Sequence, residues 1–167
     1  MRKIYILKAI IDFVWIVSMP AILLVIGLVF LVFFRDLGDL DIKINSVNFN
    51  ANDALSKTLL IISALNYLLI LGALYFFRKT LRYFLNTKIF DDVVITSFKK
   101  IGNLLSISGI VSISISFIVR IYYQQQVSFN LGLNEHIILI CLGLFFLILS
   151  EVFKIAKANK QENDLTI

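Results

Sequence analysis

Polar side chains that could carry out chemistry are rare inside the long apolar stretches of this sequence. Those within the stretches or near their ends are Asn66, Tyr67, Asn103 and Glu151. Polar groups inside a bilayer are usually functional, because placing them in lipid is costly. No two acidic residues lie deep in these stretches, so a proton or cation relay has few groups to work with.

Residues suited to nucleophilic or metal chemistry are also isolated. His136 is the single histidine and Cys141 the single cysteine, which leaves no Cys/His dyad, no disulfide and no metal-ligand cluster. The serines have no neighbouring base that could activate them as nucleophiles. No glycine-rich phosphate loop and no HExxH motif is present. We expect neither enzymatic activity nor a cofactor.

Small residues are concentrated between residues 101 and 119. They are Gly102, Ser106, Ser108, Gly109, Ser112, Ser114 and Ser116. Spacings of three and four place them on adjoining faces of a helix. Small side chains let helices approach closely in lipid, where hydroxyl groups also form hydrogen bonds between helices. The simplest interpretation is a helix-packing face; a polar substrate path lined by hydroxyls is the alternative.

Four apolar stretches must position these residues: 13–34, 58–77, 101–119 and 136–153. A hydrocarbon core of ~30 Å requires about 20 apolar residues in a helix, and the first three stretches contain no charged residue. The fourth is weaker, because its unbroken apolar part is short enough for a re-entrant segment; we favour a full span. The first stretch is too long for a signal peptide and ends without a small-residue cleavage site, so we expect it to be retained.

Composition supports the same fold class. The chain is 59% apolar and only 16% charged, whereas about 25% is usual in soluble domains. The sequence therefore predicts an all-α membrane protein, with four transmembrane helices in a bundle and a single domain over residues 1–167.

Basic residues indicate the orientation, since positively charged flanks tend to remain in the cytoplasm. With the N-terminus inside, all but four of the 16 lysines and arginines lie on the inner side. The four exceptions are Arg35, Lys43, Lys57 and Arg120. We expect both termini in the cytoplasm and the protein in the cytoplasmic (inner) membrane. The net charge of +5 then marks topology and does not predict direct nucleic-acid binding.

The inner segment between residues 78 and 100 has a helical pattern of its own. Asp91 or Asp92 can cap a helix in which Phe90, Val94 and Phe98 recur every four residues. We expect a short amphipathic helix on the inner leaflet, with Lys99 and Lys100 facing anionic headgroups. A surface helix without a dedicated function is the alternative to a docking site.

The C-terminal tail after Glu151 has basic, acidic and then apolar residues. Lys154, Lys157 and Lys160 precede Glu162 and Asp164, and the sequence ends with Leu165, Thr166 and Ile167. We hypothesise that Leu165 and Ile167 fold back onto the stripe of Phe90, Val94 and Phe98, with Glu162 and Asp164 near Lys99 and Lys100. A frayed terminus is the alternative.

The first outer segment alternates apolar and polar residues between Leu40 and Phe49, with a break at Asn45 and Ser46. This period of two favours a small external hairpin. An irregular loop with a few apolar anchors is equally compatible with the pattern.

Two parts of the sequence resemble a bacterial membrane family catalogued as domain of unknown function 2975. The inner segment from Leu81 through Phe90 to Gly102, and the tail from Ser150 to Ile167, carry the resemblance. Members show four spans, a related inner loop and a tail with a Glu-x-Phe element before a final Asp-Leu-Thr-Ile/Val. This chain departs from the family at residues 86–89, where a turn containing glycine is usual, and at Asp92, which replaces an asparagine.

The resemblance implies no established biochemical activity. Family members are often encoded beside a small helix-turn-helix regulator of the XRE type, which implies a membrane partner that senses a signal or sequesters that regulator. We expect a non-enzymatic regulatory or sensory protein. The alternatives are a small transporter or its accessory subunit, and an immunity or envelope-stress protein. Besides the lipid bilayer, the partners left open are the regulator and further copies of the chain.

Overall fold

A computed structural model describes residues 2–34, 42–44, 47–49, 53–124 and 134–165. Four long helices account for most of them: α1 (Arg2–Phe34), α2 (Ala54–Leu85), α3 (Asp92–Gln124) and α4 (Glu135–Leu165). Each is long and apolar enough to cross a membrane. The predicted stretches 13–34, 58–77, 101–119 and 136–153 each lie within one helix, which confirms an all-α membrane protein with four spans, including the short fourth stretch.

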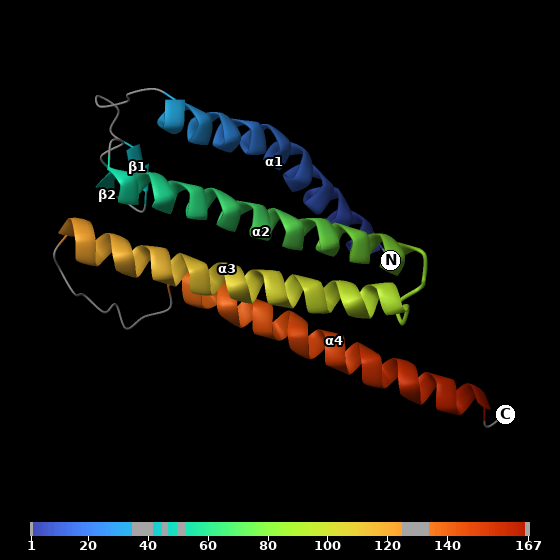
Figure 1. Ribbon diagram of the computed structural model, residues 1–167. Helices are drawn as coiled ribbons and strands as arrows, with labels where there is room; N and C mark the ends of the chain where they lie inside the picture. The colour runs from blue at the N-terminus through green and yellow to red at the C-terminus, as the bar shows by residue number, and fades with distance from the viewer. Residues whose placement is uncertain (1, 35–41, 45–46, 50–52, 125–133, 166–167) are drawn as a thin grey trace.

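The helices lie side by side in chain order (Figure 1). α1 packs on α2, α2 on α3, and α3 on α4, which crosses α3 at an angle. We define the basic end as the beginnings of α1 and α3 together with the ends of α2 and α4. The twelve basic residues expected on the inner side all belong to this end or to the α2–α3 turn.

α1 is less covered than a closed bundle would require. Only 6% of an apolar 18-residue segment of α1 is buried inside the protein, against 28% of the corresponding segments of α2 and α3. Its extensive contacts within the described chain are with α2. The four-helix fold is therefore an open row, because lipid is as apolar as leucine and supplies no hydrophobic force to cover α1 on a second side.

Within residues 53–124, all of which the structure describes, no short surface helix separate from the third span is present. α3 continues without interruption from Asp92 to Gln124. The residues expected to form the amphipathic helix therefore form the first turns of α3. Asp91 provides the cap, since its Oδ1 accepts a hydrogen bond from the Val93 backbone N–H at 2.8 Å.

The turn between α2 and α3 closes α2 with two backbone hydrogen bonds. The Thr87 N–H donates to the Phe84 carbonyl and the Lys88 N–H to the Tyr83 carbonyl, at 3.2 and 3.1 Å. This pattern is a Schellman motif, in which the residue after the cap adopts a left-handed conformation and is usually glycine. Here Thr87 occupies that position with φ 59°.

Two short strands precede α2. β1 (Ile42–Ile44) pairs antiparallel with β2 (Val47–Phe49), with Ile42 opposite Phe49 and Ile44 opposite Val47. The predicted hairpin is therefore present.

Candidate functional site

The small residues of α3 contact both neighbouring helices. A Cβ added to Gly102 would lie 2.6 Å from Leu147 Cγ, and one added to Gly109 would lie 2.5 Å from Ile140 Cγ1. Both neighbours belong to α4. Real Cβ atoms do not approach so closely, so hydrogen at these two positions permits the α3–α4 contact.

Gly143 of α4, which no sequence pattern marked as a packing residue, completes this interface. A Cβ at Gly143 would contact Ser106 Oγ and would lie 2.7 Å from the Ser106 backbone nitrogen. A lone glycine in an apolar run was its only sequence signal. It became meaningful only once α4 was placed against α3.

The serine hydroxyls point in several directions. Ser112 Oγ accepts a hydrogen bond from Asn66 Nδ2 of α2 at 2.7 Å, whereas Ser116 Oγ lies 3.0 Å from His136 Nε2 of α4. Ser108 is fully buried. Three buried oxygens have no hydrogen-bond partner among the described residues: Asn66 Oδ1, Ser106 Oγ and Ser108 Oγ. The helix contacts thus use part of this polar face and leave these three atoms unsatisfied.

An aromatic cluster closes the basic end of α2, α3 and α4. Phe98 lies 5.2 Å from Phe153 and 6.1 Å from Phe84, and Phe90 lies 6.0 Å from Phe153, measured between ring centroids. Val94 is fully buried and Phe98 is 4% exposed. Side chains of α2 and α4 cover Val94 and Phe98, because α3 continues straight into the protein core. Docking of the tail on this stripe stays a prediction.

The tail extends α4 past this cluster (Figure 1). Lys157 Nζ lies 2.5 Å from Asp92 Oδ2, and Lys160 Nζ lies 6.0 Å from the centroid of Phe90. Glu151 forms a weak local pair with Lys154 at 4.0 Å. Glu162, Lys99 and Lys100 are exposed. The side chains of Asp164 and Leu165, and all of Ile167, lie outside the described residues.

An ionic contact joins α1 to α2 at the basic end. Arg78 Nε donates a hydrogen bond to Asp12 Oδ1, and Lys8 Nζ lies 3.7 Å from Asp12 Oδ2. The Trp15 ring lies 5.8 Å from that of Tyr75, and the Arg78 guanidinium lies 6.0 Å from the Trp15 centroid.

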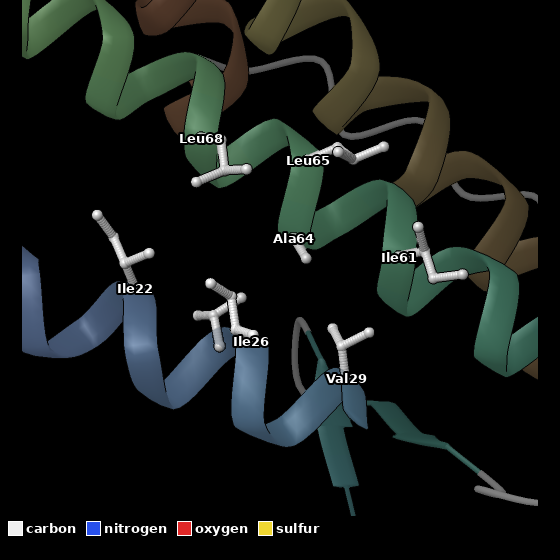
Figure 2. A pocket seen from close by; sticks show the side chains of 8 residues that line it. Ile22, Ile26, Val29, Ile61, Ala64, Leu65 and Leu68 are labelled. Atoms are coloured by element: carbon white, nitrogen blue, oxygen red, sulfur yellow. The ribbon is translucent and has the colours of Figure 1, made fainter. Parts of the chain in front are cut away.

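Two hollows flank this contact. An apolar hollow of about 200 Å³ separates α1 from α2 nearer the opposite end (Figure 2); the side chains that line it include Ile22, Ile26, Val29, Ile61, Ala64, Leu65 and Leu68. A polar hollow of about 350 Å³ lies at the end of α2. Four cations line it, with two tyrosines and Asn86: Arg78, Lys79, Arg82 and Lys88.

Helix lengths, apolarity and the buried interhelix hydroxyls together define a multi-pass integral membrane protein with four helices. The chain belongs to the family described as protein of unknown function (DUF2975), which it matches over residues 43–167. The match covers α2, α3 and α4, whereas α1 lies before it. Neither the comparison with curated proteins nor that with solved structures found a match.

Proposed function

We propose that this protein is a non-enzymatic regulatory or sensory protein of the bacterial cytoplasmic membrane, whose basic end faces the cytoplasm and binds a soluble partner. The family resemblance suggests a small helix-turn-helix regulator of the XRE type as that partner. Regulation then consists of holding the regulator at the membrane, with no contact between this chain and nucleic acid.

The observation that carries the proposal is the length of α4. Its helix continues for twelve residues beyond Phe153, to Leu165, which is about 18 Å at 1.5 Å per residue. A helix that only crossed the membrane would need no such extension. The Lys157–Asp92 pair and the Lys160–Phe90 contact hold its first turns against α3, so the projecting part has a defined direction.

Charge on the projecting part suits a surface that selects one partner. Lys154, Lys157 and Lys160 lie before the acidic and amide residues 161–164. A bipolar charge pattern of this kind contributes more to specificity than to affinity. The apolar surface of the partner interface would have to supply most of the binding free energy, since exposed ion pairs contribute only ~0–1 kcal/mol each.

Co-purification tests this proposal. The full-length protein is extracted in mild detergent together with the product of the neighbouring gene, and the retained regulator is quantified. Deletion of residues 161–167 should leave membrane insertion intact but abolish capture. A variant with the same seven residues in scrambled order provides the matched control for length and charge. Equal capture by all three proteins would remove the tail from the proposal.

A transporter or its accessory subunit is the second candidate. Within the described residues, the buried oxygens of Asn66, Ser106 and Ser108 have no hydrogen-bond partner. This favours the second candidate, because water or substrate could satisfy them. Replacing Ser108 by cysteine in a Cys141→Ser background distinguishes the two functions. Labelling by a membrane-impermeant thiol reagent would indicate an aqueous path, whereas protection supports a packed interface.

A further inference from the structure

The polar hollow at the end of α2 combines a concave shape with an excess of positive charge. Its lining contains Arg78, Lys79, Arg82 and Lys88 and no carboxylate. Arg78 pairs with Asp12, and the Asp12 carboxylate also pairs with Lys8. Lys79, Arg82 and Lys88 form no ion pair within the described part of the chain. The hollow therefore keeps about three positive charges that an anion can neutralise.

The position of the polar hollow at the end of the apolar stretch of α2 indicates where that anion comes from. Tyr75 lies inside the apolar stretch 58–77 and Arg78 follows that stretch directly. The contact between Trp15 and Tyr75 at the rim is typical of the aromatic belt at a membrane interface. The hollow thus opens at headgroup depth, where phosphate groups of the adjoining lipids lie next to it.

We propose that this hollow binds the phosphate headgroup of an anionic phospholipid from the adjoining leaflet. Arginine guanidinium groups bind phosphate oxygens through paired N–H donors, and lysines add charge. The Asn86 amide and the tyrosine hydroxyls supply neutral donors. A cluster of four or more lysines and arginines directly after a membrane helix is a known mode of anionic lipid recognition. The proposal does not depend on the regulatory partner.

Trp15 provides an internal probe, because it is the single tryptophan and lies at the rim of the hollow. The full-length protein is reconstituted in phosphatidylcholine with brominated acyl chains, which quench tryptophan fluorescence on contact. Unlabelled phosphatidylglycerol is then titrated in. We expect phosphatidylglycerol to relieve quenching about tenfold more effectively than unlabelled phosphatidylcholine at low salt, and this preference should decrease at high ionic strength.

A charge-matched pair of variants locates the site. The triple variant Lys79→Gln, Arg82→Gln, Lys88→Gln should lose the preference for phosphatidylglycerol. The control Arg2→Gln, Lys3→Gln, Lys99→Gln removes the same types and number of charges from exposed positions of the same end and should keep it. If the triple variant does not fold, Lys88→Glu in the exposed turn should still reduce the preference.

Four outcomes would overturn the proposal. If the two unlabelled lipids relieve the quenching of Trp15 equally in the wild-type protein, the hollow is not a site for anionic lipid. A triple variant that keeps the preference, or a control that loses it equally, assigns the effect to diffuse surface charge. Displacement of phosphatidylglycerol by free glycerol 3-phosphate would show that the hollow takes a soluble phosphate instead.

Discussion

Arg78 of α2 donates a hydrogen bond to Asp12 of α1, and this contact holds the least covered helix of the protein at its basic end. Both side chains are about 30% exposed, so the surrounding water and headgroups screen part of the attraction. Further along, the apolar hollow separates the same two helices. The basic end is therefore where α1 depends on a specific polar contact.

Loss of that contact should loosen α1. Asp12→Asn or Arg78→Gln should lower the free energy of unfolding in detergent by about 1 kcal/mol, because a charge-assisted hydrogen bond is lost. Lys8→Gln, which removes only the longer pair within α1, should cost less. Exchanging the two charges, with Asp12→Arg and Arg78→Asp together, should recover part of the loss. Additive effects of the two exchanges would show that the residues do not interact.

Close approach of α3 and α4 should make their glycines intolerant of larger side chains. Gly109→Leu and Gly143→Ala should each destabilise the protein by about 1–3 kcal/mol, because the added atoms meet α4 or α3 backbone. Thermal melting in detergent measures the effect. Gly27→Ala is the matched control, since nothing lies within 4 Å of its added Cβ. Wild-type melting of Gly143→Ala would mean that this interface is not packed.

Ser112→Leu tests the other side of α3. It removes the hydrogen bond with Asn66 and inserts a larger side chain between α2 and α3. The hydrogen bond itself contributes about 0.6 kcal/mol by the average for membrane helices. Ser112→Ala should therefore cost about that amount, and Ser112→Leu clearly more. Equal stability of both variants would place this side chain toward lipid.

Relief of backbone strain should stabilise the α2–α3 turn. Thr87 has φ 59°, which costs a β-branched residue on the order of 1 kcal/mol. Thr87→Gly should raise the free energy of unfolding by about that amount. Lys88→Gly, one residue later in the same turn, should not. A destabilised Thr87→Gly protein would indicate that the threonine hydroxyl, which bonds to the Asn86 carbonyl at 2.7 Å, matters more than the strain.

The charge of the basic end predicts the orientation of the protein in the membrane. Reporter fusions at Lys88 and after Ile167 should give cytoplasmic signals, and fusions at Asn48 and Gln125 should give external ones, because basic flanks resist translocation. An external signal at Lys88 would reverse the assignment and place the proposed lipid site in the opposite leaflet.

The span of each helix could be predicted from local sequence alone. Length and apolarity decide whether a helix can cross a bilayer, and both are properties of one contiguous stretch. The pairing of β1 with β2 and the cap at Asp91 were equally local, since alternation and capping depend on neighbouring residues. The family resemblance likewise depended on short segments of sequence.

Only the tertiary structure shows which helix faces contact each other. A periodic stripe shows that Phe90, Val94 and Phe98 share a face, but a leaflet surface and a protein core suit that face equally well; only the positions of Phe84 and Phe153 decide for the core. The same applies to Gly143, the Asp12–Arg78 contact and the hollow at the end of α2. Sequence determined which segments enter the membrane, because lipid selects on apolarity. The packing decided which faces meet, because that depends on the rotation of each helix about its axis, which one sequence without its neighbours in space does not specify.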